Sequence, residues 1–476
     1  MTDYDELLDA CIPPSGWISE PAAAYAAGSR WNERHLQCVW FDPRLRPRTL
    51  ATADRESVEV VDPGRWNLEA GPDFLDAVLK VGQEKRLVTG DVEIHVRPGD
   101  WSAHHHSEDP RYANVIAHVT YRAPTPASAP DFLPPGCLQI GLRAALAEMP
   151  WFSFDDIDLA AYPFAIQPDT PRPCAAALAN DPDRALELLA VAGRHRFARK
   201  CDRMRTLLAR SDDPSQVFYS EFLAALGYKR NSAACRALAA AVPLATWRND
   251  APVEEHYARL LGAAGLLPSA DAGRDDESRE FIRYLWDSWW RDPAEKPESP
   301  PSWALDSTRP ANHPARRLAA AAAFFAAERA PIEFFANMAA TDHELFQKRA
   351  IAFLTGLQMD FWTRHASLVG AKCTRTGGAL IGRNRAAAIV SNLLLPILAA
   401  TDALPAPPGH LPPEDISAPM RTAANHLFGR DHNPAMYAND GLLQQGLLQI
   451  FSDFCLQAKC GCDGCALPGF LKRTAS

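Results

Sequence analysis

The stretch that decides the fold of this chain reads GPDF at residues 71–74 and continues, after a turn, as GDVEIHV at residues 90–96. Apolar and polar residues alternate in the second segment, which is typical of a β-strand because successive side chains point to opposite faces. We therefore expect Asp91, Glu93 and His95 to share one face while the valines and the isoleucine face a core. Carboxylates and an imidazole that converge in this way suit a divalent metal ion.

Two predicted strands, Phe74–Val81 and Arg86–Val96, flank a short turn and form a hairpin. In a simple antiparallel hairpin centred on residue 83, Asp73 lies opposite Glu93, with Cβ atoms about 4.5–5.5 Å apart. Two carboxylates at that separation can share a hard cation, so we expect Asp73 and Glu93 to bind Mg²⁺ or Mn²⁺. A bulge at Thr89-Gly90 would shift this register.

This arrangement resembles the core of the PD-(D/E)xK nuclease superfamily, in which an Asp begins one strand and an acid-x-Lys triplet lies on the next. Asp73 matches the first element, and Glu93-Ile94-His95 matches the second, with His95 where lysine is usual. The resemblance implies that Asp73, Glu93 and His95 are catalytic and that the substrate is DNA or RNA. The further candidates for this site are Glu69, Asp91, His104 and His106.

The histidine in place of lysine leaves two outcomes open. Lysine would orient or activate the attacking water, and His95 can do this as a base near neutral pH or can bind a metal. Either the chain is a metal-dependent nuclease or phosphodiesterase, or it is an inactive nuclease-like protein that binds nucleic acid or acts as a scaffold. The alternative without a functional site is a surface hairpin whose polar face is only solvated.

A histidine-rich run follows the hairpin. Trp101 and two small residues precede His104, His105 and His106, and His118 lies in a further predicted strand. Histidine clusters bind transition metals, so we expect one of the three consecutive histidines to face the site. His118, among apolar neighbours, is expected to be a hydrogen-bonded core residue. A small-molecule metalloenzyme that uses this cluster is a third hypothesis.

The chain is expected to be an α+β protein. Residues 1–165 form a predicted nuclease-like α/β domain with a mixed sheet, which includes a strand at Asn114–Arg122. Residues 174–476 form a predicted α-helical domain, with a sub-boundary in the Pro-rich stretch 292–301. The expected helices are Arg184–Arg210, Phe218–Leu226, Val253–Leu266, Ser278–Trp290, Pro314–Arg329, Arg385–Ala399 and Leu442–Leu456.

Four cysteines cluster near the end of the chain, with the spacing C-x4-C-x-C-x2-C. Zinc and a [4Fe–4S] cluster both need four such ligands, and this spacing does not distinguish them. We therefore expect the helical domain to end in a cysteine-liganded metal loop over residues 455–465. The alternative is a redox-labile or unliganded tail. The four cysteines are Cys455, Cys460, Cys462 and Cys465.

One helix carries a basic face. Its cations fall at i, i+3, i+4 and i+7, which places them on the same side of the helix. Such a face can neutralise phosphates of DNA or RNA, whereas the alternative is a solvated or salt-bridged face. The four residues are Arg196, Arg199, Lys200 and Arg203.

Composition limits the remaining classes. The chain has 476 residues, of which 47% are hydrophobic and 22% charged, as in ordinary soluble proteins. The net charge of −9 argues against attraction of the whole surface to nucleic acid or anionic membranes. The most apolar window, residues 386–400, contains Pro396 and is shorter than the roughly 20 residues that cross a bilayer. We expect no membrane span, and no signal peptide is visible, so a cytoplasmic protein is expected.

Several stretches together resemble a bacterial family known only as domain of unknown function 2851. The resemblance spans most of the chain and brings no established function, but it groups these stretches into one architecture. The C-terminal cysteines belong to this group. The other stretches are Trp66–Phe74, Gly90–His95, Trp101 with the histidines, Tyr112–Val119, Arg309–Pro314 and Ile381–Arg385.

Overall fold

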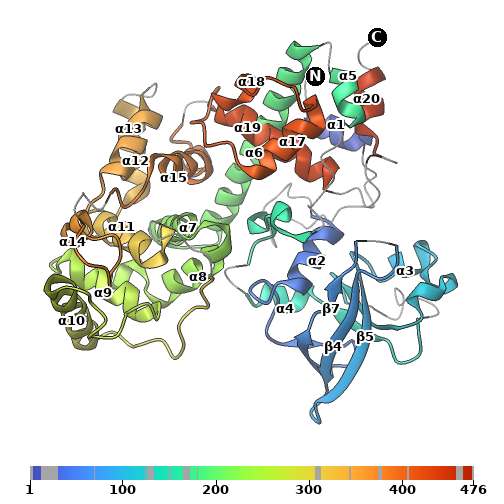
Figure 1. The fold of residues 1–476 in the computed structure, drawn as a ribbon, viewed down its shortest axis with the longest axis horizontal. Coiled ribbons are helices and arrows are strands. Elements are labelled where there is room, and N and C mark those ends of the chain that lie inside the picture. The colour runs from blue at the N-terminus through green and yellow to red at the C-terminus, as the bar shows by residue number, and fades with distance from the viewer. Residues whose placement is uncertain are drawn as a thin grey trace.

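A computed structural model shows a mixed sheet in the N-terminal part of the chain and helices in the C-terminal part (Figure 1). Both features were expected from the sequence, and both are confirmed. The structure describes residues 4–11, 31–68, 70–123, 125, 133–149, 152–163, 172–178, 181–305, 312–341, 345–373, 378–404, 407–456, 462 and 465–473. In this part of the chain, no helix is both long and apolar enough to cross a membrane.

Within the described residues, the sheet has seven strands in the order β1-β2-β4-β5-β6-β7, with β3 paired to β4. The β5–β6 and β6–β7 pairs are parallel and the others are antiparallel. A bridge between Thr52 and Ile140 joins the two ends of the sheet, which therefore curls on itself. The strands are β1 Leu50–Ala51, β2 Ser57–Asp62, β3 Arg65–Trp66, β4 Phe74–Val81, β5 Arg86–His95, β6 Val115–Thr120 and β7 Leu138–Gly141.

The β4–β5 hairpin has the predicted register at its open end, where Phe74 pairs with Val92. This pairing sets Asp73 beside Glu93. The register does shift, not at Thr89-Gly90, where the sequence left a bulge open, but at a bulge in β4 between Phe74 and Ala77. Asp76 occupies it with a positive φ of 61°, and its backbone N–H donates to Asp91 Oδ1 at 3.1 Å.

Both faces of β5 are covered over its last six residues, 90–95, whereas Arg86, Leu87 and Thr89 near the turn are exposed. Val92 and Ile94 are fully buried in a core that α2 (Glu33–Phe41) helps to form. Glu93 and His95, on the other face, are only 2% and 0% exposed. The hypothesis of a solvated hairpin is therefore wrong. Three short elements follow β5 and precede β6, namely α3 Asp100–Ala103, η2 His106–Glu108 and η3 Pro110–Tyr112.

The long helix α6 (Pro182–Ala209) connects two helical regions and packs along α19 (Gly441–Ile450) (Figure 1). The contact is close because glycines face it from both helices. A Cβ atom on Gly193 would overlap the carbonyl of Leu442, and one on Gly446 would overlap the carbonyl of Leu189. The C-terminal end of the chain is thereby held against α6.

The described apolar side chains form two large cores. One core lies among the helices between Phe197 and Leu411 and also includes Leu442 of α19. The other combines the sheet with α1, the first turns of α6 and the C-terminal helices. The chain therefore leaves the core that contains the sheet after α6 begins and returns to it at α17. The predicted domain boundaries stay predictions.

The remaining helices of the described chain follow these bounds. The predicted helix Arg385–Ala399 is interrupted by a π-turn, η9 (Val390–Leu394), just before Pro396, which lacks a backbone N–H. The others are α1 Tyr4–Cys11, α4 Arg143–Ala147, η4 Phe154–Asp156, η5 Leu159–Ala161, α5 Pro173–Leu178, α7 Pro214–Leu226, α8 Tyr228–Ala241, η7 Leu244–Thr246, α9 Val253–Ala263, α10 Asp276–Arg291, α11 Pro314–Ala327, α12 Pro331–Thr341, α13 Phe346–Gly356, α14 Asp360–Arg364, α15 Arg383–Ile389, α16 Leu395–Ala400, α17 Ala418–Phe428, α18 Ala435–Ala438, η10 Phe451–Cys455 and α20 Leu467–Arg473.

A buried carboxylate ties α6, α7 and α8 together, and its removal should destabilise the fold. Glu221 accepts from Arg203 at 2.8 Å and from Arg236 at 2.7 Å, and it is 8% exposed. Glu221→Gln removes the buried counter-charge that Arg203 and Arg236 share and leaves them only Asp156, so we expect the free energy of unfolding in urea to fall by about 3 kcal/mol. Asp202→Asn is the control, since it removes an exposed pair with Arg205 on the same helix and should cost at most about 1 kcal/mol. Equal losses in the two variants would contradict this.

The same carboxylate makes stability depend on pH. Burial alone would raise the pKa of Glu221, but Arg203 and Arg236 more than offset burial and hold that pKa well below its ordinary value. The stabilisation should be present above about pH 4.5, the ordinary value, and should be lost as pH falls towards the lowered pKa. Unfolding titrations at several pH values should show this dependence weakened in Glu221→Gln.

Candidate metal centre

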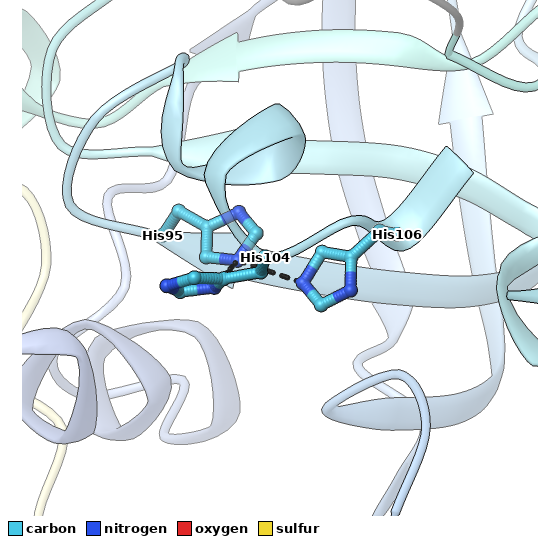
Figure 2. Close-up of side chains that lie close together, drawn as sticks. All are labelled: His95, His104 and His106. Carbon is cyan, nitrogen blue, oxygen red and sulfur yellow. Dashed lines mark hydrogen bonds between the residues drawn. The ribbon is translucent and has the colours of Figure 1, made fainter. Parts of the chain in front are cut away.

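Three imidazoles converge where β5 ends (Figure 2), and the carboxylate of Glu93 lies beside two of them. His95 Nε2 lies 3.2 Å from His104 Nδ1 and 3.2 Å from His106 Nε2, and the three nitrogen atoms are all within 4.8 Å of one another. Glu93 Oε1 lies 3.3 Å from His95 Nε2 and 3.2 Å from His106 Nε2. We call these four residues the histidine site.

The local backbone explains why two histidines of the loop point inward. Trp101 is fully buried, donates to Ser107 Oγ at 2.9 Å and packs edge-on against the His106 ring. His105 adopts the left-handed conformation, with φ of 57°. That turn directs the side chains of His104 and His106 back towards β5, while the His105 side chain remains exposed.

The site combines a buried end with an accessible one. Burial lowers the pKa of His95 to about 3, so this imidazole is neutral near pH 7 and has a lone pair to offer. His106 is 9% exposed and stacks on Tyr112 at 3.9 Å between ring centroids. His104 is exposed and forms the solvent side of the site.

His118 orients the central ligand from β6. Its Nε2 atom lies 2.9 Å from His95 Nδ1, and it is 1% exposed. Burial lowers the pKa of His118 to about 3 as well, so a neutral pair in which His95 Nδ1 donates to His118 leaves His95 Nε2 bare. The expectation that His118 is a hydrogen-bonded core residue is confirmed.

The two carboxylates of the hairpin are adjacent, as the register implies. The Asp73 backbone N–H donates to Glu93 Oε2 at 3.0 Å, and Asp73 Oδ2 accepts from the backbone N–H of Ile94 at 3.1 Å. Asp73 thus helps to fix the Glu93 carboxylate through this backbone hydrogen bond. Asp91 lies on the same face of the strand, but its carboxylate accepts a hydrogen bond from the backbone N–H of Asp76 in the β4 bulge. Glu69, the other carboxylate predicted here, lies outside the described residues.

The spacing of the donors fits one metal ion. Ligands bound tetrahedrally at about 2.0–2.1 Å stand about 3.3–3.4 Å apart, which is close to the distances between His95 Nε2 and its three neighbours. Among the described residues, the group whose ligand atoms all lie within 4.8 Å of one another consists of the three histidines, and Glu93 lies beside two of them. In their metal-binding states, these atoms direct lone pairs at one another, and a cation would relieve that repulsion. Imidazole nitrogens favour a transition-metal ion over Mg²⁺.

Sequence reasoning missed a polar group on α2 beside this site. Arg34 and Gln37 are 8% and 0% exposed, and Arg34 Nη1 donates to Gln37 Oε1 at 2.8 Å. Burial lowers the pKa of Arg34, and the nearby Asp73 carboxylate partly offsets this shift, so the guanidinium lies within electrostatic range of the hairpin acids. The capping residue Asn32 was the signal for this helix.

The predicted basic face of α6 turns inward. It lines a cavity of about 140 Å³ together with η4, η5, α19 and η10. Arg196 donates to the side-chain oxygens of Gln445 and Gln449, and Arg199 pairs with Asp155 at 3.3 Å. Lys200 also donates to Gln445, and Arg203 to Glu221. Phosphate binding by these four cations stays a prediction, and it would have to compete with these partners.

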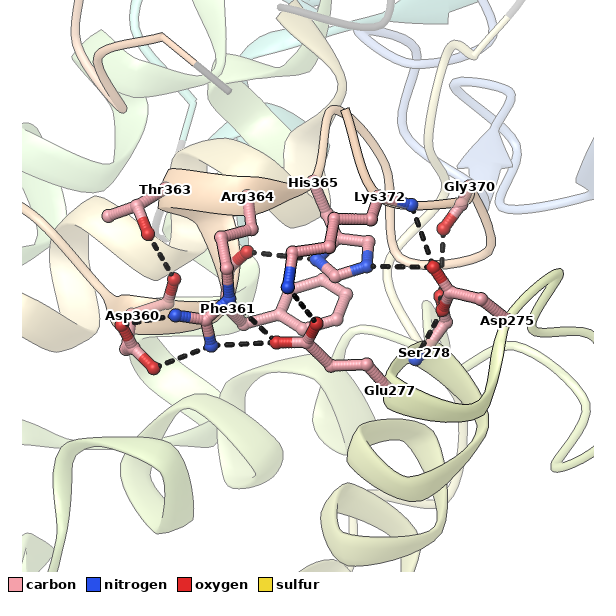
Figure 3. Close-up of polar contacts among 10 residues, drawn as sticks. All are labelled: Asp275, Glu277, Ser278, Asp360, Phe361, Thr363, Arg364, His365, Gly370 and Lys372. Carbon is pink, nitrogen blue, oxygen red and sulfur yellow. Dashed lines mark hydrogen bonds and ion pairs between the residues drawn. The ribbon is translucent and has the colours of Figure 1, made fainter. Parts of the chain in front are cut away.

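A second polar cluster, at the start of α10, has a structural role (Figure 3). Asp275 caps the helix by accepting from the Ser278 backbone N–H at 2.8 Å and also faces His365 Nε2 at 3.4 Å. Arg364 of α14 pairs with Glu277 at 2.6 Å. These contacts join α10 to α14 and the loop behind it.

Comparisons with known proteins identify one family. The family described as "Protein of unknown function (DUF2851)" matches residues 33–404. This range holds α2, the sheet, the histidine site and the helices through α16, and it ends before the C-terminal cysteines that we also grouped with the family on sequence. No curated protein and no solved structure matches the chain.

The histidine site should bind one Mn²⁺ ion, and loss of a donor should weaken that binding. We expect His106→Ala and Glu93→Gln each to raise the dissociation constant by more than about 100-fold, and His118→Gln to raise it by about 10–100-fold through loss of orientation. Calorimetric titration with Mn²⁺ measures this, because thiolates elsewhere in the chain prefer softer ions. His105→Ala, an exposed neighbour in the same loop, should bind like the unsubstituted protein. The site assignment fails if His105→Ala and His106→Ala behave alike.

Proposed function

We propose that this chain, which belongs to the DUF2851 family, is a divalent-metal-dependent phosphodiesterase that cleaves nucleic acid. The observation that carries the proposal is the convergence of Glu93 and His95 of β5 with two histidines of the following loop, beside Asp73 at the start of β4. This is the position at which the PD-(D/E)xK pattern, which the sequence resembles, has its acids. The chemistry is assigned from this geometry, because the family itself brings no activity.

In this proposal His95 has a role that differs from that of the usual lysine. Its Nε2 atom lies among the other donors, 3.3 Å from Glu93 Oε1, and its Nδ1 atom is held by His118. In this proposal His95 is a metal ligand, and the donor set has more nitrogen than the Asp-Glu pair that the sequence suggested. A transition-metal ion is therefore proposed in place of Mg²⁺, and Mn²⁺ serves as its probe in the experiments.

Each residue of the site has a separate role in the proposed chemistry. A bound ion would polarise a phosphoryl oxygen and lower the pKa of a water molecule. Glu93, His95 and His106 would hold it from the buried side. Asp73 would orient Glu93, and His118 would orient His95. His104 is exposed, so a phosphodiester would approach from its side.

A small-molecule metalloenzyme is the second candidate. The histidine-rich donor set favours it, because three imidazoles and a carboxylate are also suited to transition-metal chemistry that needs no nucleic acid. Its substrate would enter by the same exposed side, next to His104.

The phosphodiesterase proposal predicts cleavage that depends on Glu93. Protein loaded with Mn²⁺ should cut labelled single-stranded or double-stranded DNA or RNA on a gel. Glu93→Gln should reduce the rate by about 100-fold or more, because it weakens a ligand and removes its charge. His105→Ala should cut at the unsubstituted rate.

Other results would assign the site differently. If no DNA or RNA is cut by metal-loaded protein, the phosphodiesterase proposal is rejected. Salt-sensitive DNA binding that is equal in Glu93→Gln would then indicate the inactive, nucleic-acid-binding alternative. Turnover of small esters or phosphates that requires His106 would instead favour the second candidate.

A further inference from the structure

Four cysteines from distant parts of the sequence gather at the C-terminal end of the fold. Cys174 lies in α5, Cys455 ends η10, and Cys462 and Cys465 precede α20. Helices α5 and α20 pack against each other, and they lie side by side near α1 (Figure 1). Cys174 was not among the ligands predicted from the sequence.

Each of the four thiols lies within electrostatic range of the other three. Cys455 interacts in this way with Cys174, Cys462 and Cys465, Cys174 interacts with Cys462 and Cys465, and these last two interact with each other. The Cys465 backbone N–H also donates to the Cys462 carbonyl at 3.2 Å, which closes a turn between them. A metal site with four thiolate ligands requires four cysteines that lie near one another, and these four meet that requirement.

The surroundings suit a site that carries negative charge when its thiols ionise. Arg172 Nη1 donates to Cys462 Sγ at 3.8 Å, and its guanidinium would offset part of that charge. Cys174 is 6% exposed, and Cys455 and Cys465 pack on the core that contains the sheet. Buried, clustered thiols gain most from a cation, because it stabilises the thiolate form that burial disfavours.

We propose that Cys174, Cys455, Cys462 and Cys465, here called the cysteine site, hold a [4Fe–4S] cluster. Tetrahedral zinc with Zn–S distances of about 2.3 Å would bring the four sulfurs about 3.8 Å apart. Across the described ranges, no three cysteine sulfurs lie within 4.8 Å of one another. A cluster of four irons is larger than one ion, so it spans sulfurs that stand farther apart.

The cluster would be structural. All four positions would be filled by cysteine, and the cluster would fasten α5 to the C-terminal helix. This inference is independent of the function proposed for the histidine site, since the two sites share no residue. Cys460, part of the predicted quartet, lies outside the described residues and is not one of the four ligands proposed.

Metal and sulfide analysis of the full chain tests the proposal. Protein purified without oxygen should contain about four iron and four acid-labile sulfide atoms per chain and absorb broadly in the visible range. Cys174→Ser and Cys465→Ser should both lose this absorbance and the iron. Cys11→Ser should keep both, since Cys11 ends α1 and lies outside the cysteine site, and so should Cys460→Ser.

A buried thiol elsewhere separates loss of ligand from loss of fold. Cys235 is 2% exposed and lies outside the cysteine site, so Cys235→Ser carries a similar burial cost and should keep its iron. The proposal is overturned if the unsubstituted protein holds zinc or no metal, or if Cys174→Ser retains full iron. It is also overturned if Cys460→Ser or Cys235→Ser loses as much iron as Cys174→Ser.

Discussion

The buried imidazole of His95 is the group on which the N-terminal half depends. It is fully buried, and both of its nitrogens are engaged, Nδ1 with His118 and Nε2 with the remainder of the histidine site. A buried polar group is costly unless it is satisfied, so the hairpin, β6 and the loop after β5 must be correct together. A slip of one residue in β5 would exchange His95 with Ile94 and remove every one of these contacts.

The same arrangement links metal binding to folding. The loop that carries His104 and His106 rests on a small apolar cluster of Trp101, Tyr112 and Val115, separate from the two large cores. Little apolar area therefore holds the loop, and its histidines supply much of what orders it. An ion bound by both the loop and the strand would replace repulsion between lone pairs with shared coordination. Its binding free energy would therefore also stabilise the folded conformation of the loop.

Local pattern is enough to predict part of this structure. Alternation identifies both strands of the hairpin, and their midpoint places Asp73 beside Glu93, because these features depend on neighbouring residues. The histidine site needs more than pattern. Two of its ligands point inward only because His105 takes a left-handed conformation, and the polar face is buried only because a later loop folds over it. Tertiary contacts decide both features, so the sequence suggested Asp73 and Glu93 as the ligands and did not select the three histidines that the fold brings together.

The cysteine site shows the same limit over a longer range. Spacing reveals ligands that are close in sequence, whereas Cys174 becomes a neighbour of Cys465 only when α5 packs on α20. That packing follows from α6 and α19, whose glycines allow the close crossing that returns the chain to the core containing the sheet. The family match includes the histidine site and ends at residue 404, before three of the four cysteines of the other site. The chemistry of the first site therefore need not require the second, and a cluster there would act on the first site only through the core that the two ends of the chain share.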